Sequence, residues 1–152
     1  MPRREPTLQP LGDTLLFMHQ LWELAHALQV RSKRMARTLG VTSPQRLVIR
    51  VLGQSPGITA RELAGALGIH PSTLTGVLAR LEKRELIARK VDAVDRRRAR
   101  FELTEKGKRI DREKKGTVEA AVRRALDKAG GPTVGKTSEM LGLLVQELVK
   151  PD

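Results

Sequence analysis

The most constraining feature of the sequence is a tight glycine turn between two short helical segments, within residues 59 to 83. The first segment opens with Thr59-Ala-Arg-Glu62, a capping box in which two side chains satisfy free backbone N–H groups at a helix start. Gly68 suits the left-handed position after this helix. Pro71 suits the first turn of the next helix, which makes His70 its expected N-terminal cap. Two short helices that meet across such a turn predict a helix-turn-helix.

The second of these helices, expected from Pro71 to Arg84, has a slim outer face. At about 100° per residue, its apolar side chains fall on one arc: Leu74, Val77, Leu78 and Leu81. The opposite face and its flanks carry small or polar residues: Ser72, Thr73, Thr75, Gly76, Ala79, Arg80 and Lys83. A helix that only faces water has no need of small residues there, whereas a helix that approaches another surface closely does.

The apolar pattern changes from a helical period to a period of two after Leu86. Residues 87 to 91 and 98 to 103 therefore predict the two strands of a hairpin. The polar loop between the strands is dense in arginine. A hairpin with an arginine-rich tip, directly after a helix-turn-helix, predicts a winged helix.

Further helices flank this unit. We expect them over residues 11 to 39, from the capping box Thr42-Ser-Pro-Gln45 onward, from the cap Thr104 to about residue 129, and over residues 137 to 149. Residues 1 to 9 predict a flexible arm. The expected core of the winged unit consists of Leu47, Leu63, Leu67, Leu74, Leu78, Leu81 and Phe101.

The first and last helices carry more apolar residues than one core-facing side requires. The residues concerned are Leu15, Met18, Leu21, Leu141, Leu144 and Leu148. They could fold onto the core of their own subunit. Because the winged unit already has a core, we expect them to interlock with a second copy and form a homodimer.

The formal charge of +12 favours a polyanionic partner, and nucleic acid before a membrane surface. No run approaches the roughly 18 apolar residues of a membrane helix, and the N-terminus has no signal-peptide pattern. The absence of cysteine excludes disulfides, thiolate metal sites and thiol redox sensing, so we expect a cytoplasmic protein. Aromatic residues make up only 2% of the chain, which argues against recognition by base stacking.

Residues 42 to 107 resemble the multiple-antibiotic-resistance regulator (MarR) family through five segments: TSPQ, TARELAGALGIHPSTLT, LEKRELIARK, DAVDRRR and LTEKG. The resemblance implies a mainly α protein with a small β-hairpin wing (α+β). It implies a winged helix-turn-helix at residues 41 to 104 and helical dimerisation regions at residues 10 to 40 and 105 to 152. The implied function is that of a DNA-binding transcription regulator, usually homodimeric and often a repressor that a small ligand releases.

By position in this family, the helix that begins at Pro71 is the recognition helix and residues 87 to 103 form the wing. In the family's D-x-R wing pattern, Asp95 would brace Arg97, which reaches toward the minor groove. Glu85 stands where the family usually has glycine. A left-handed backbone there costs a non-glycine residue about 1 kcal/mol, so we expect the recognition helix to end slightly differently.

The candidate DNA-binding residues are Arg61, Ser72, Thr73, Thr75, Gly76, Arg80, Lys83, Arg96, Arg97 and Arg98. Hydroxyl groups, arginines and the free N–H groups of a helix start are typical contacts to phosphates and base edges. The alternatives are that Ser72 and Thr73 only cap the helix, and that the arginine run is an ordinary solvated loop.

His19, Glu23 and His26 share one face of the first helix, together with Trp22. The spacing would permit metal ligation, but no further ligand is near in the sequence, so we expect no metal and no cofactor. Packing or plain exposure is one interpretation of these residues. The other is a ligand cleft between this helix and the winged unit, for a small aromatic or anionic effector.

The sequence therefore predicts a homodimeric regulator on a pseudo-palindromic DNA duplex, with recognition helices about 34 Å apart. An architectural nucleic-acid binder would fit the charge equally well. An enzyme is not indicated, because the chain has no cysteine nucleophile, no glycine-rich phosphate loop and no second set of histidines and carboxylates. The operator, the regulated genes and the effector are not encoded in any pattern that we find.

Overall fold

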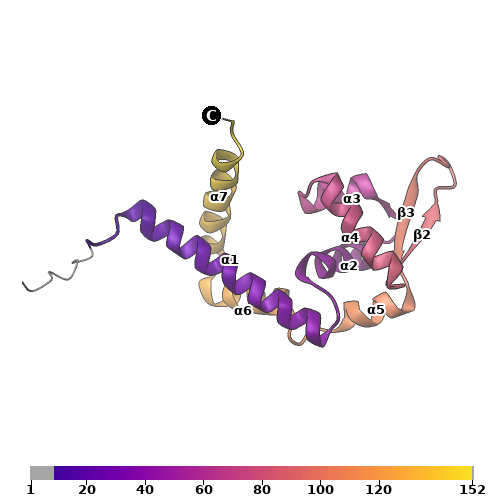
Figure 1. The fold of residues 1–152 in the computed structure, drawn as a ribbon, viewed down its shortest axis with the longest axis horizontal. Helices are drawn as coiled ribbons and strands as arrows, with labels where there is room; N and C mark the ends of the chain where they lie inside the picture. Colours follow the sequence, from indigo (N-terminus) through magenta and orange to yellow (C-terminus); the bar gives the residue numbers. More distant parts are fainter. Residues whose placement is uncertain (1–8, 152) are drawn as a thin grey trace, which may run out of the picture.

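The computed structural model describes residues 9–151, so nearly all of the predicted arm at residues 1 to 9 lies outside the described residues (Figure 1). The elements, in chain order, are α1 (Asp13–Thr38), α2 (Ser43–Gln54), β1 (Ile58–Thr59), α3 (Ala60–Leu67), α4 (Pro71–Lys83), β2 (Ile87–Val91), β3 (Ala99–Leu103), α5 (Glu105–Arg112), α6 (Val118–Ala129) and α7 (Gly131–Leu148). We call residues 41–112 the winged lobe, and α1, α6 and α7 together the helical arm. The arm leads away from the lobe (Figure 1).

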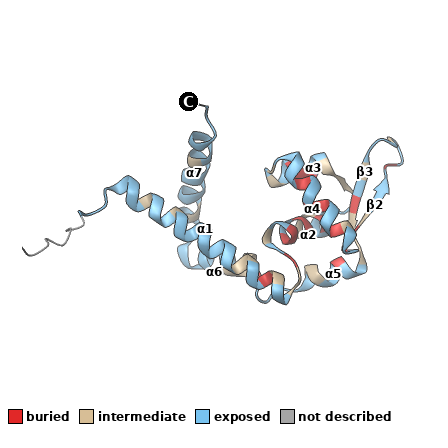
Figure 2. Cartoon of the chain, viewed as in Figure 1, coloured by how far each residue is buried: buried red, intermediate tan, exposed pale blue. Residues whose placement is uncertain are grey.

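The core lies in the winged lobe, where the buried residues concentrate (Figure 2). A three-stranded antiparallel sheet in the order β1-β3-β2 packs with α2, α3 and α4. The core includes Val48, Ile49, Leu52, Leu63, Leu74, Leu78, Leu81, Leu86 and Phe101. The prediction of Leu47 as a core residue is wrong: it is 48% exposed, because α2 turns its neighbours Val48 and Ile49 inward instead. Leu67 lies at the edge of the core.

The local signals around the helix-turn-helix are confirmed. The Glu62 carboxylate accepts the Thr59 N–H at 2.7 Å, and the Glu62 N–H donates to the Thr59 hydroxyl, so the capping box of α3 is complete. Gly68 ends α3 in the left-handed conformation, with φ of 61°. The expectation that the helix ends differently at Glu85 is wrong: Glu85 has a positive φ, of 57°, so the chain leaves α4 in the left-handed conformation that glycine would take there.

Two predictions about the elements are wrong, and one element was not predicted. The helix expected from Thr104 to residue 129 is two helices, because α5 ends at Arg112 and α6 starts after the buried cap Thr117. The last helix starts at Gly131 rather than near residue 137, because proline is tolerated in the first turn of a helix. Strand β1 was not predicted, since two residues carry no periodicity.

α5, counted with the terminal helices by the sequence, lies against α2 and β3 in the winged lobe. The Thr104 hydroxyl donates to the Glu85 carbonyl at 2.7 Å and accepts the Gly107 N–H at 3.1 Å. A side chain at Gly107 would overlap the Leu86 carbonyl. The segment LTEKG therefore fastens the start of α5 to the end of α4.

The helical arm is built differently. α1 buries one residue, Met35, and α6 and α7, both fully described, bury none. Large apolar side chains stay exposed along α1 and α7, including Leu15, Met18, Trp22, Leu24, Leu28, Met140, Leu141, Leu143, Val145 and Leu148. Leu21 and Leu144 are half-buried. Among the described residues, no helix combines the length and apolarity that crossing a membrane requires.

Candidate nucleic-acid interface

The outer face of α4 is exposed along its whole length. Its inner side chains, Leu74, Val77, Leu78 and Leu81, are buried in the core. The outward residues are Ser72, Thr73, Thr75, Gly76, Arg80 and Lys83, all of them exposed. The structure therefore brings six of the ten candidate DNA-binding residues together on one helix face.

The hydroxyl groups at the start of α4 differ in their freedom. The Ser72 hydroxyl lies 2.7 Å from His70 Nδ1, and the same nitrogen accepts the Ser72 N–H at 3.3 Å, so His70 is the cap that the sequence predicts. The Thr75 hydroxyl donates to the Pro71 carbonyl at 2.9 Å. Within residues 9–151 the Thr73 hydroxyl has no hydrogen-bond partner. Thr73 is therefore the hydroxyl most available to a phosphate.

Gly76 leaves space on the outer face of α4. A Cβ atom at this position would meet no other atom within 4 Å. Its backbone has helical angles that any residue can adopt, since Gly76 is not among the residues with positive φ. Nothing inside the described chain therefore requires glycine at this position, and its role in close approach to DNA stays a prediction.

The wing loop is held by a buried aspartate that the sequence analysis missed. The Asp92 carboxylate accepts the N–H groups of Val94 at 2.7 Å and Asp95 at 3.0 Å, and also pairs with the Arg100 guanidinium. These bonds, with the Asp95 N–H first, lower the pKa of Asp92 to about 2. Arg100 also donates to the Gly57 carbonyl at 2.7 Å, which ties the wing to the turn before β1.

The expected bracing of the wing by Asp95 has another geometry. Asp95 accepts the backbone N–H of Arg97 at 3.0 Å, but its carboxylate pairs with the Arg98 side chain at 3.2 Å. Within the described chain the Arg97 guanidinium has no ion-pair partner. Asp95 thus fixes the backbone of the tip, and Arg97 keeps its charge available to a ligand.

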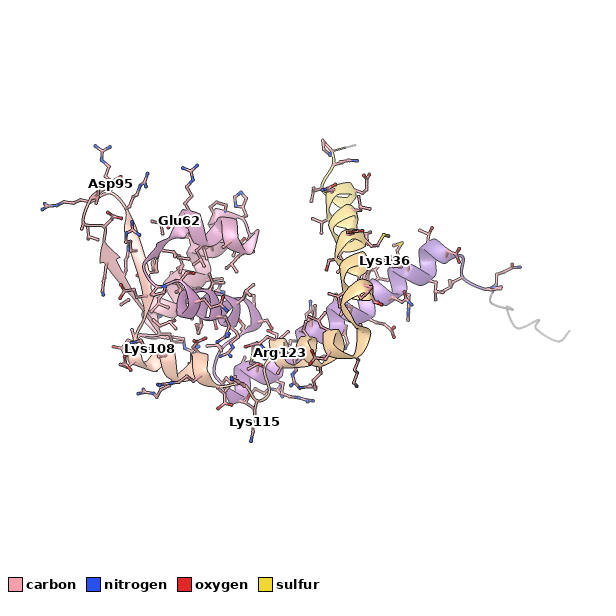
Figure 3. The ribbon with its side chains drawn as sticks, turned by 180° about the vertical axis from the view of Figure 1, so that it is seen from behind. Glu62, Asp95, Lys108, Lys115, Arg123 and Lys136 are labelled. Atoms are coloured by element: carbon pink, nitrogen blue, oxygen red, sulfur yellow. The ribbon has the colours of Figure 1, made fainter. Side chains whose placement is uncertain are left out.

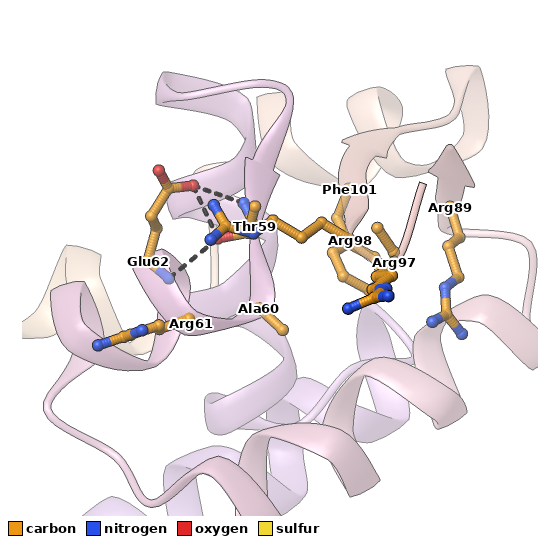
Figure 4. A pocket seen from close by; sticks show the side chains of 9 residues that line it. Thr59, Ala60, Arg61, Glu62, Arg89, Arg97, Arg98 and Phe101 are labelled. Carbon is orange, nitrogen blue, oxygen red and sulfur yellow. Dashed lines mark hydrogen bonds between the residues drawn. The ribbon is translucent and has the colours of Figure 1, made fainter. Parts of the chain in front are cut away.

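A groove of about 590 Å³ runs between the wing and the start of α3 (Figure 4). Arg61 lies on the α3 side, Arg89 on the β2 side, and Arg97 and Arg98 between them (Figure 4). The lining therefore includes four arginines and one carboxylate, that of Glu62. The bond from the Thr59 N–H, followed by the Thr59 hydroxyl, lowers the pKa of this carboxylate. Such a groove suits the sugar-phosphate backbone of a nucleic acid.

Arg89 is a functional candidate that the sequence analysis passed over. Its guanidinium group lies 6.0 Å from the centroid of the Phe101 ring, which holds it over the opposite strand. The signal was present, because an arginine in a strand beside an arginine-rich loop shares one surface with that loop. Arg96 is exposed at the tip but does not line the groove.

The wing tip and the start of α3 face one side of the lobe. Asp95 and Glu62 lie together on that side, whereas Lys108 of α5 lies on the opposite side (Figure 3). The basic residues of α5 are therefore separate from the surface described above.

The residues of the predicted ligand cleft lie on α1. His19 and Glu23 are 3.6 Å apart and exposed, Trp22 is 66% exposed, and His26 is exposed. Among the described residues, no group of three or more histidines and carboxylates could hold a metal ion. All four side chains are exposed in the described chain, so the cleft stays a prediction.

The chain is similar to known proteins in sequence and in fold. Residues 41–99 match the model of the MarR family. The HTH-type transcriptional repressor Rv2887 of Mycobacterium tuberculosis is 28% identical over 131 residues, which are 86% of this chain and 94% of that protein. The crystal structure of Rv2887 with p-aminosalicylic acid is 27% identical, with a TM-score of 0.53, over 83% of this chain and 95% of that one.

The chain also has the fold of the protein in the crystal structure of the S. aureus MepR–DNA complex. The TM-score is 0.71 and the identity 21%, over 87% of this chain and 97% of that one. Family model, relatives and fold agree on the same winged lobe. Residues 41–99 therefore match the MarR family, and over most of its length the chain is similar to an HTH-type transcriptional repressor and has the winged-helix fold.

Proposed function

We propose that the chain is a homodimeric repressor that recognises a pseudo-palindromic DNA operator. The observation that carries the proposal is the slim, exposed face of α4 beside a groove with four arginines. α4 enters a major groove, which is about 12 Å wide, and Gly76 and the hydroxyls allow its backbone to come close. Phosphates lie in the groove at Arg61 and Arg89, and Arg97 at the wing tip reaches the next minor groove.

The homodimer follows from the helical arm. Leu15, Met18 and Leu141 are exposed in the single chain, and Leu148 is 76% exposed. Monomeric proteins seldom expose apolar surface over two whole helices. A two-fold axis through the paired arms places the two α4 helices in successive major grooves, about 34 Å apart.

A small aromatic or anionic effector is the finer part of the proposal. It is supported by the structure of the relative Rv2887 with p-aminosalicylic acid. The residues that would line its cleft are His19, Trp22, Glu23 and His26, with the second wall supplied when the dimer forms. Binding there would change the angle between arm and lobe and so release the DNA.

The decisive experiment selects bound fragments from genomic DNA and measures the affinity of the purified protein for the selected sequence and for a scrambled one. A regulator prefers its operator by roughly 10³-fold or more. A preference below about tenfold would replace this function by that of an architectural DNA binder, whose contacts are only to phosphates. Release of the operator by p-aminosalicylic acid and related acids tests the effector separately.

A further inference from the structure

A buried arginine lies at the junction between the winged lobe and the helical arm. The side chain of Arg46, in α2, is only 3% exposed. Its guanidinium group donates to the carbonyl groups of Ile110, Asp111 and Glu113 at the end of α5, the last at 2.6 Å. It also pairs with the carboxylate of Glu119, in α6, at 2.6 Å. All three nitrogen atoms of the Arg46 guanidinium group therefore have a hydrogen-bond partner.

These partners are the groups that helix ends leave free. The last carbonyls of α5 have no following helical N–H, and a positive charge is favourable at that end of a helix. Glu119 lies in the first turn of α6, where a negative charge is favourable. One planar guanidinium group thus joins the end of α5 to the start of α6. A lysine, with its single ammonium group, cannot bridge both in the same way.

Few other polar contacts join the lobe to the arm. Within residues 9–151, another side-chain hydrogen bond between them runs from the Ser43 N–H to the Ser32 hydroxyl, at 2.9 Å, and Arg84 of the lobe donates to the carbonyl of Gly40, in the segment after α1. Arg50, one turn further along α2, pairs with Asp111 of α5 at 2.7 Å and so stays within the lobe. In the described chain, Arg46–Glu119 is therefore the ion pair that links the two parts.

We propose that Arg46 and Glu119 are positioning residues that set the spacing between the two operator half-sites. The inference rests on the proposed function, because a dimer joined through its arms places each recognition helix by the angle between lobe and arm. One base pair inserted between half-sites moves them by about 3.4 Å and turns them by about 35°. While the ion pair fixes the angle between lobe and arm, the lobe cannot move to reach a displaced half-site. Without the ion pair, the lobe can reorient and bind it.

The first test compares the selected operator with versions that have one or two base pairs added at the centre. The wild type prefers the native spacing, and Glu119→Gln, which keeps the size but removes the charge, reduces that preference by about five- to tenfold. Arg46→Met reduces it further, and Arg46→Lys lies between. The matched control is Arg50→Met, which breaks an ion pair of the same α2 and leaves the spacing preference unchanged.

The second test needs no DNA. The chain has no cysteine, and Val94 at the wing tip is 95% exposed, so Val94→Cys gives one spin label per chain. In the dimer, the distance between the two labels has a narrow distribution in the wild-type background and a broad one with Glu119→Gln. Thermal unfolding of each variant shows whether the lobe is folded, and Glu119→Gln serves where Arg46→Met does not fold.

The outcomes separate the two proposals. If the wild type prefers its operator and its spacing, and Glu119→Gln keeps both the preference and the narrow distribution, the positioning role is wrong and the regulator stands. If the wild type prefers no operator, the regulator and the positioning role both fail. A broadened distribution together with a lost spacing preference, and an unchanged Arg50→Met control, establishes the role of the pair.

Discussion

In the winged lobe, apolar side chains from three helices and a sheet close around one core, whereas α6 and α7, both described in full, bury no side chain within their own chain. Both parts are helical and of similar length, and both carry leucine at helical spacing. The difference is where the partner surface comes from. The lobe closes its own core, whereas the apolar residues of the arm stay exposed in the described chain and would be covered by a second copy in the proposed dimer.

The largest effect that separates the helical arm from the lobe is expected from a charge placed on the arm. Leu141→Asp introduces a carboxylate where the second copy packs in the proposed dimer, so we expect it to weaken the dimer by about 3–5 kcal/mol, as an unpaired buried charge does. The lobe stays folded, because Leu141 is exposed in the single chain. Analytical ultracentrifugation measures the dimer constant, and circular dichroism measures the fold.

Val94→Asp, a charge on the exposed wing tip, is the control and leaves the dimer unchanged. A wild type that sediments as a monomer at micromolar concentration would show that the arm needs no second copy.

The next prediction tests whether DNA binding by the lobe can be changed without a change in its fold. Arg97→Ala removes a guanidinium group without an ion-pair partner among the described residues, so it costs no fold stability. We expect it to weaken operator binding by about 1–3 kcal/mol. Fluorescence anisotropy with labelled operator measures the change, and unaltered affinity in the folded variant would remove the wing from the interface.

Gly76→Ala separates the fold of the lobe from its contact with DNA. Alanine is the better helix former and meets no atom within 4 Å, so we expect unfolding to require roughly 0.5–1 kcal/mol more free energy. The same methyl group stands between α4 and the DNA, so operator binding weakens by about 1 kcal/mol or more. Gly65→Ala, on α3, is the control that changes stability alone. Unimpaired binding would mean that α4 does not lie close to DNA at this point.

Glu85→Gly tests the strain at the end of α4. Glu85 has a φ of 57°, which glycine adopts without cost, so we expect the lobe to gain up to about 1 kcal/mol in the free energy of unfolding. Urea denaturation measures the gain. The dimer constant and the operator affinity should not change, and a loss of stability would show that the Glu85 side chain stabilises the lobe.

The smallest expected effect is the loss of order in the wing loop when acid protonates Asp92. The pKa of Asp92 is lowered to about 2 from 3.8, so its contribution to wing order is complete above pH 3.8 and is lost as the pH falls through 2. Asp92→Asn removes this titration. Amide NMR signals of Val94 and Asp95 follow it, and identical acid profiles in both proteins would contradict the role of the carboxylate.

The lobe was predictable from sequence because its signals are local. A capping box, Gly68 and the alternation after Leu86 each act over a few residues, and all three are confirmed. The missed features depend on residues far apart in the chain. Nothing near Arg46 reveals that its partners lie more than sixty positions away, and Arg89 gains its meaning from a groove that folding creates. The prediction for Leu47 failed because the helical spacing of α2 fits two neighbouring apolar faces, and the structure buries the one with Val48 and Ile49.

The hydrogen bond within α4 at Thr75 has a consequence for the bases that this helix can read. Its hydroxyl proton is directed to the Pro71 carbonyl, so only oxygen lone pairs face outward. In the major groove, such lone pairs match the amino groups of adenine and cytosine, but not the acceptor atoms of guanine. If α4 reads an operator as proposed, a base that contacts the Thr75 hydroxyl is therefore expected to carry an amino group.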